Sequence, residues 1–188
     1  MPPTHSTALI IIDMINALDF DGGAALLKNA LPAAHRIARL KYRARQAGAP
    51  VIYANDNYGQ WRSDFRQVVA VCGESGSRGA PLVQALQPEP DDYFVLKPKQ
   101  SAFHATALEL LLHDLGVHRL VLTGTAADNC VLATATDAHI RDFEILVPGD
   151  CLASVTRART TRALAQIRDT LQADTRPSTR ITRALLQG

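Results

Sequence analysis

The chain has 188 residues, 47% of them hydrophobic and 20% charged, a size and composition that predict one soluble globular domain over residues 1–188. Basic residues are spread along the sequence and the formal net charge is only +2, which argues against a nucleic-acid-binding protein. The three cysteines, Cys72, Cys130 and Cys151, show neither a disulfide framework nor a metal-binding spacing, so reduced thiols in a cytoplasmic protein are the simplest interpretation.

The first half of the chain predicts strands that alternate with helices. The continuous β-branched run at residues 7–13 indicates a strand buried on both faces, as in a parallel sheet, and it is far too short to span a membrane. The next elements are a helix at 24–46 with a candidate break near Pro32, a strand at 51–56, a short helix at 80–87 and a strand at 93–97. Residues 57–79 predict a long polar connection of a kind that is often functional.

The second half continues the alternation. Its predicted elements are a helix at 106–115, a strand at 120–123, a helix at 130–141, a strand at 144–148, a helix at 157–171 and a short sixth strand near 173–176. This order predicts an α/β sandwich with a mainly parallel sheet. Because crossovers in such folds are right-handed, the carboxyl ends of the strands share one edge, where ligands bind.

Chemically active residues follow three of these strands. Asp13 follows the first, Lys97 ends the third and Cys130 follows the fourth, so all three are expected at the same edge of the sheet. Each has a structural alternative. A lone cysteine is often a buried apolar residue, a lysine at a strand end is usually solvated, and an aspartate there often forms a turn or caps a helix.

Together the three residues would make a coherent catalytic group. The ammonium of Lys97 and the helix expected to begin at Cys130 would both lower the pKa of the thiol. Asp13 would accept the thiol proton and return it to a leaving amine. Backbone N–H groups of the turn at residues 126–130 could stabilise an oxyanion, since its small residues allow a carbonyl to approach closely.

These residues lie in segments that resemble the isochorismatase-like cysteine hydrolase superfamily, which includes nicotinamidases, N-carbamoylsarcosine amidase and ureide hydrolases. The matching segments are 11–16 (IIDMIN), 97–103 (KPKQSAF) and 124–131 (GTAADNCV). Their order and spacing span nearly the whole chain. Lys99 competes with Lys97 as the family lysine, but the following Ser-Ala-Phe at 101–103 favours Lys97.

The resemblance implies a catalytic triad of Asp13, Lys97 and Cys130. It also implies a cis peptide bond between Thr125 and Ala126, and an oxyanion hole made by the N–H groups of Ala126 and Cys130. The implied fold is a three-layer, Rossmann-like α/β/α sandwich with a six-stranded, mainly parallel sheet. The family commonly forms homo-oligomers, so a homodimer or homotetramer is expected, with a small-molecule substrate as the other partner.

One departure from the family pattern bears on metals. Nicotinamidases of this superfamily carry a metal site with an Asp-x-His sequence after the second strand, whereas residues 55–58 here read Asn-Asp-Asn-Tyr. Tyr58 stands where the histidine is expected, and none of the six histidines lies in the loop that follows. We therefore expect no metal and no other cofactor.

Three further residues are candidates for the substrate pocket. Asn16 could orient Asp13 or a substrate, although a turn residue is an equal alternative. Trp61, in the polar connection, could line the pocket or a subunit interface. Phe103 could form a pocket wall or belong to the core.

The predicted function is cleavage of a C–N bond in a small amide, carbamoyl compound or ureide, through a thioester on Cys130 and without a metal. Two alternatives remain open at this level. One is a hydrolase of a non-amide C–O bond, and the other is a non-catalytic scaffold in which the triad is vestigial. A redox-sensing role for the thiol is weaker, because the sequence shows no obvious resolving cysteine.

Overall fold

The computed structural model describes residues 6–57 and 64–187. Its centre is a six-stranded sheet in which every pairing is parallel. The strands are β1 (Thr7–Ile12), β2 (Val51–Asp56), β3 (Tyr93–Lys97), β4 (Arg119–Thr125), β5 (Glu144–Leu146) and β6 (Leu152–Ala153). Their spatial order is β3-β2-β1-β4-β5, with β6 also paired to β4. The expected parallel α/β architecture is confirmed.

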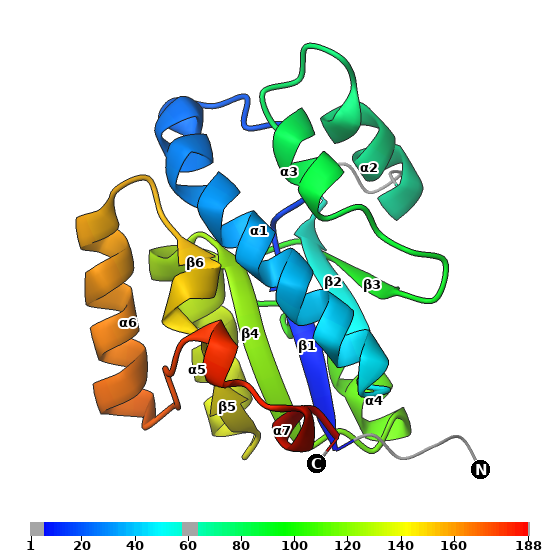
Figure 1. Ribbon diagram of the computed structural model, residues 1–188, viewed down its shortest axis with the longest axis vertical. Helices are drawn as coiled ribbons and strands as arrows, with labels where there is room; N and C mark the ends of the chain where they lie inside the picture. The colour runs from blue at the N-terminus through cyan, green and yellow to red at the C-terminus, as the bar shows by residue number, and fades with distance from the viewer. Residues whose placement is uncertain (1–5, 58–63, 188) are drawn as a thin grey trace.

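Helices cover both faces of this sheet (Figure 1). One face carries α1 (Gly23–Gln46), α2 (Phe65–Gly73), α3 (Ala80–Ala85) and α7 (Arg183–Gln187). The other carries α4 (Leu108–Asp114), α5 (Leu132–Ile140) and α6 (Arg157–Leu171). Short turns of other helix types occupy Ala127–Val131 (a π-turn), Gly149–Cys151 and Ser178–Arg180.

Burial on both faces explains why the sequence of the central strand β1 is apolar without alternation. All six of its residues are buried. Leu9 and Ile11 pack into the core beneath α1, whereas Ile10 and Ile12 pack into the core beneath α4 and α5. Successive side chains of a strand point to opposite faces, so a strand covered by helices on both sides needs apolar residues at every position.

Three expectations about the elements are corrected. Pro32 lies inside α1 without ending it, because the buried apolar face of this long helix outweighs the loss of one backbone hydrogen bond. The connection at 57–79 contains α2, whose Phe65 and Val68 are buried. The sixth strand is Leu152–Ala153, whereas Asp174 forms only an isolated bridge to Leu146.

Candidate active site

The side chains of Asp13, Lys97 and Cys130 meet at the carboxyl edge of the sheet. The Lys97 Nζ lies 2.8 Å from Asp13 Oδ2 and 3.5 Å from Cys130 Sγ. The Lys97 side chain is fully buried and that of Asp13 is 8% exposed. The ammonium therefore lies between a carboxylate and a thiol where little water competes for either contact.

Asp13 is held by the two strands that flank its own. The backbone N–H of Asp56, at the end of β2, donates to Asp13 Oδ1 at 2.7 Å. On the other side, the Thr125 hydroxyl donates to the Asp13 carbonyl at 3.1 Å. Asp13 has a left-handed backbone with φ of 49°, a conformation that aspartate tolerates better than most residues and that occurs often at functional sites.

A shared hydroxyl joins the segment after Lys97 to the turn that carries the cysteine. Thr134 Oγ1 accepts from the Ala102 N–H at 3.0 Å and donates to the Cys130 carbonyl at 2.7 Å. Lys97 Nζ also donates to the Lys99 carbonyl at 3.2 Å, whereas the Lys99 residue itself is exposed. Only Lys97, of these two lysines, reaches the buried group.

The turn around Cys130 begins earlier than its sequence predicts. The expected helix start was Cys130 itself, but the π-turn already begins at Ala127 and α5 continues from Leu132. The Ala126 carbonyl accepts from the N–H groups of Asn129 and Val131, at 3.0 and 3.2 Å. The peptide bond between Thr125 and Ala126 is cis. Cys130 thus lies within the first turn of the helical segment, not at its first residue.

Gly124 allows β4 to approach β1 closely just before this turn. Its φ is +117°, and a Cβ atom there would lie 2.0 Å from the carbonyl oxygen of Ile12. We expect Gly124→Ala to lower the free energy of unfolding by about 3 kcal/mol or more, because backbone strain and a backbone clash add. Urea denaturation measures the loss.

Gly48→Ala is the matched control for that substitution. Gly48 also has a positive φ, +78°, but a Cβ atom there would meet nothing within 4 Å. Only the cost of the left-handed conformation remains, about 1 to 2 kcal/mol. Equal losses for the two variants would show that the contact between β1 and β4 does not require a glycine.

The electrostatics of the buried group corrects one expectation. The Cys130 thiol was expected to have a lowered pKa, but burial and the neighbouring Asp13 carboxylate raise the pKa of Cys130 to about 12, against the opposing effect of Lys97. Burial also raises the pKa of Asp13, with Lys97 offsetting part of the shift. Burial acts to lower the pKa of Lys97, but its attraction to Asp13 and Cys130 leaves that pKa raised.

This combination describes a resting state with a neutral thiol next to an ion pair. Asp13 and Cys130 interact closely enough for each to shift the pKa of the other, so a carboxylate lies next to the proton that must leave the sulfur. A carboxylate with a raised pKa is a stronger base than an ordinary one.

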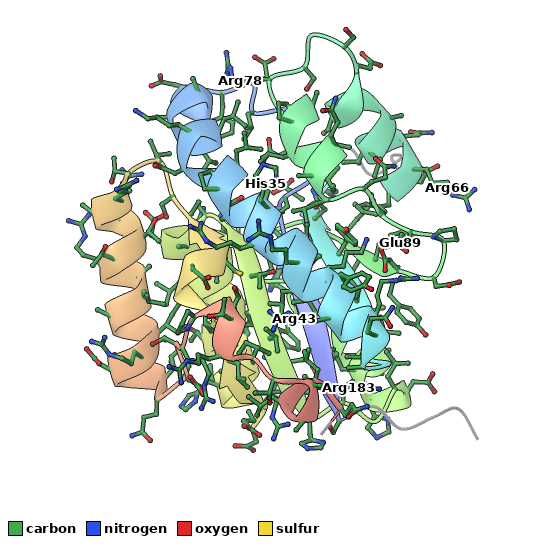
Figure 2. The ribbon with its side chains drawn as sticks, in the orientation of Figure 1. His35, Arg43, Arg66, Arg78, Glu89 and Arg183 are labelled. Carbon is green, nitrogen blue, oxygen red and sulfur yellow. The ribbon has the colours of Figure 1, made fainter. Side chains whose placement is uncertain are left out.

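A cleft of about 680 Å³ opens above these groups. The described residues that line it include Asp13, Asn16, Phe20, Asp21, Asp56, Thr125, Ala126, Asp128, Asn129, Cys130 and Arg159. Arg78, labelled in Figure 2, donates to the Leu18 carbonyl and so fixes the segment after β1 that forms part of this lining. The volume suits a small molecule.

The three candidate pocket residues have different outcomes. Asn16 lines the cleft, although its Oδ1 also accepts from the Leu18 N–H at 2.8 Å and so forms a turn. Trp61 lies outside the described residues. Of the two alternatives for Phe103, the structure shows the core: its ring is buried 5.8 Å from that of Phe143, Arg141 lies over it, and it is not among the described residues that line the cleft.

Other cleft residues were not singled out from the sequence. Asp56 ends β2, and the strand-end reasoning applied to Asp13 and Lys97 would have found it. Asp128 and Asn129 lie in the turn that carries the cysteine, where the sequence pointed to backbone N–H groups and not to these side chains. Arg159 comes from the first turn of α6, and no local pattern in the sequence distinguishes it from the other basic residues of that helix.

The described residues also bear on metal binding and on membrane insertion. Among residues 6–57 and 64–187, no group of three or more His, Cys, Asp or Glu side chains is arranged to hold a metal ion. None of the helices in these same ranges combines the length and the apolar character needed to cross a membrane.

Comparisons with known proteins agree with the geometry. Residues 7–176 match the family model described as the isochorismatase domain. The uncharacterized isochorismatase family protein YaaI of Bacillus subtilis is 43% identical over 147 residues, covering 78% of this chain and 80% of that protein. The ureidoacrylate amidohydrolase RutB of Methylorubrum extorquens is 30% identical over 180 residues, covering 77% of this chain and 68% of that enzyme.

A solved structure shows the same fold over nearly the whole chain. The N-carbamoylsarcosine amidase of Thermoplasma acidophilum superposes with a TM-score of 0.70 and 25% sequence identity. The match covers 92% of this chain and 96% of that one. Both this enzyme and the ureidoacrylate enzyme are, by name, hydrolases of C–N bonds.

Proposed function

Because the chain belongs to the isochorismatase family, whose members include amidohydrolases, we propose that it hydrolyses a C–N bond of a small amide, carbamoyl compound or ureide through a thioester on Cys130. One observation carries the proposal. The Lys97 ammonium contacts both the Asp13 carboxylate and the Cys130 sulfur, and Asp13 and Cys130 line one cleft. A carboxylate and a thiol beside a cleft, both in contact with a buried cation, are the groups that nucleophilic acyl transfer would need.

The first half-reaction forms the thioester. Asp13 accepts the proton of the Cys130 thiol as the sulfur attacks the substrate carbonyl carbon, which gives a tetrahedral intermediate with a negative oxygen. The leaving nitrogen takes the proton back from Asp13 as the C–N bond breaks, and ammonia or an amine departs. Lys97 stabilises the negative charge on sulfur while the proton is on Asp13.

The intermediate oxygen needs hydrogen-bond donors. The N–H groups of Ala126 and Cys130 are the proposed donors, since both residues line the cleft at the turn that carries the nucleophile. Backbone donors of this kind are fixed before the reaction and need no reorganisation during it.

The second half-reaction releases the acid. With the amine gone, a water molecule enters the cleft, gives a proton to Asp13 and attacks the thioester carbon. The C–S bond breaks, Cys130 regains its proton, and a carboxylic or carbamic acid leaves. The raised pKa of Asp13 suits a group that must accept and return a proton in each half-reaction.

The proposed reaction uses no metal. The cleft lining, as far as the structure describes it, contains no histidine, and Tyr58 stands where related nicotinamidases have their metal-binding histidine. The carbonyl would be activated by backbone N–H groups, not by a metal ion.

Ammonia release across a panel of primary amides, carbamoyl compounds and ureides tests the proposal. We expect turnover of at least one class, and a loss of roughly ten-thousandfold or more in Cys130→Ala with unchanged thermal stability. Cys72→Ala is the matched control, because Cys72 is buried in the core and away from the cleft.

The outcomes separate the proposal from its rivals. Release of an alcohol or enol without ammonia or amine would indicate a C–O hydrolase. Turnover that survives in Cys130→Ala would exclude the thioester, and the absence of turnover across the whole panel would favour a non-catalytic scaffold.

A further inference from the structure

A second carboxylate in the cleft is fixed by a buried hydroxyl. Asp128 lies two residues before Cys130 and lines the same cleft. The Ser154 hydroxyl donates to Asp128 Oδ1 at 2.6 Å, and the Asp128 N–H lies 3.4 Å from the same hydroxyl oxygen. Ser154 is fully buried. The carboxylate is therefore held in one orientation beside the nucleophile before any ligand arrives.

The cation nearest to this carboxylate is held much less firmly. Arg159 Nε lies 3.8 Å from Asp128 Oδ2, at the outer limit of an ion pair. The Arg159 side chain is 53% exposed, and that of Asp128 is 31% exposed. Exposed pairs of this kind contribute little, because water screens them and the long side chain loses entropy when it is fixed. A ligand cation could therefore replace Arg159 at Oδ2 at little cost.

The charge of the described cleft lining favours such a replacement. Arg159 is the one basic residue among the described residues of that lining, whereas Asp21, Asp56 and Asp128 are acidic residues of the same lining. The negative charge of Asp13 is balanced by Lys97, so Asp13 does not contribute to the excess of negative charge in the cleft. A concave site with one sign of charge concentrates ligands of the opposite sign.

We propose that Asp128, positioned by Ser154, determines specificity by binding an ammonium or guanidinium group of the substrate beside Cys130. The proposal rests on the amidohydrolase function and names its substrate class: amides or carbamoyl compounds that carry a positive charge near the scissile carbonyl. Substrates with a carboxylate at the same place are disfavoured.

Charged thiol reagents test the proposal without requiring turnover. The probes are two methanethiosulfonates, the cationic ethyltrimethylammonium and the anionic ethylsulfonate derivative. Each transfers its thioalkyl group to the sulfur of Cys130, forming a disulfide and releasing methanesulfinate. The rate at Cys130 is followed by mass spectrometry and divided by the rate with a small neutral thiol, which removes the reagents' intrinsic difference. Cys130→Ala supplies the background.

Substitutions of Asp128 and of Arg159 should change the ratio of the rate with the cationic reagent to the rate with the anionic reagent in opposite directions. The ratio should be roughly fivefold or more in the wild type, fall about three- to tenfold in Asp128→Asn, and rise in Arg159→Gln. Ser154→Ala should lower it part of the way, because the carboxylate loses its anchor. Asp114→Asn, an exposed site at the end of α4, should leave it unchanged.

Two results would overturn the proposal. One is a wild-type preference for the anionic reagent that disappears in Arg159→Gln, which would make Arg159 an anion-binding residue. The other is a ratio that does not change in Asp128→Asn. Since the readout is thiol modification, a protein that turns over no amide but shows the expected ratios would contradict the amidohydrolase proposal alone.

Discussion

Asp13→Asn should reduce turnover to the level of Cys130→Ala while lowering the pKa of the thiol. The amide cannot accept the thiol proton, so the proposed base is lost, with an expected decrease of roughly ten-thousandfold. The Asp13 carboxylate is also one of the two main causes that raise the pKa of Cys130 to about 12. Without it, burial alone opposes the effect of Lys97 on the thiol, so the pKa of Cys130 falls.

The pH dependence of the thiolate absorbance measures the second effect. The difference between Asp13→Asn and Asp13→Asn/Cys130→Ala isolates the signal of Cys130, and Asp114→Asn controls for the loss of an exposed carboxylate. An ordinary thiolate enzyme would gain activity when its thiol pKa falls, whereas the mechanism proposed here loses it. Retained activity in Asp13→Asn would remove Asp13 from its role as base.

The pH dependence of wild-type turnover follows from the role of Asp13 as the base. Turnover requires Asp13 as a carboxylate, so kcat/KM should fall as the pH falls through the Asp13 pKa. Burial raises that pKa above its usual value, so the fall should begin at a higher pH than an ordinary aspartate would give.

Lys97→Met should cost both stability and activity. The substitution keeps a long apolar chain in a fully buried site but leaves the Asp13 carboxylate, only 8% exposed, without its cation. Loss of one partner of a buried ion pair typically costs about 3–5 kcal/mol. The pKa of Asp13 would rise further without Lys97, which opposes the effect of burial, so less of the carboxylate would be available as the base and turnover should also fall. Urea denaturation and the ammonia assay measure the two effects.

The nearby lysine provides the matched control. Lys99→Met changes an exposed side chain and should have little effect on either measurement. In the double variant Asp13→Asn/Lys97→Met both charges are gone, so part of the lost stability should return. A single variant Lys97→Met as stable as the wild type would show that Asp13 has another source of charge compensation.

The pH dependence of the stability of Lys97→Met has a definite sign. The folded-state pKa of Asp13 is raised by burial, and removal of Lys97 raises it further because the cation opposes the shift. Such a group contributes stability below its unfolded pKa and loses that contribution as the pH rises through its folded pKa. The difference from the wild type should therefore be small in acid and grow toward neutral pH.

The sequence was sufficient to predict which residues would meet, because the geometry of parallel sheets is general. Strand ends share one edge, and this rule brought Asp13, Lys97 and Cys130 together from positions far apart in the chain. The sequence was not sufficient to predict the pKa of the thiol. A helix dipole and a lysine near Cys130 predict a lowered pKa, but desolvation and the Asp13 carboxylate raise it. Both of these effects depend on packing that no local pattern encodes.

Two further features of the site could not be predicted, for a similar reason. Phe103 lies in a segment adjacent to the site, but packing against Phe143 and Arg141 places its ring in the core. The partnership of Asp128 and Ser154 joins the cysteine turn to β6 and the segment after it, and depends on how the last third of the chain folds back. Propensity and periodicity describe neighbours along the chain, whereas these contacts depend on tertiary structure.

The position of β1 between β2 and β4 has a consequence for synthesis of the chain. β2 follows β1 closely in sequence, but the other edge of β1 pairs with Arg119–Thr125, which leaves the ribosome much later. Until then the apolar run Thr7–Ile12 has an unpaired edge, the kind of segment that templates association between nascent chains. The arrangement that assembles the proposed active site (Figure 1) thus also leaves one edge of the first strand unpaired during much of translation.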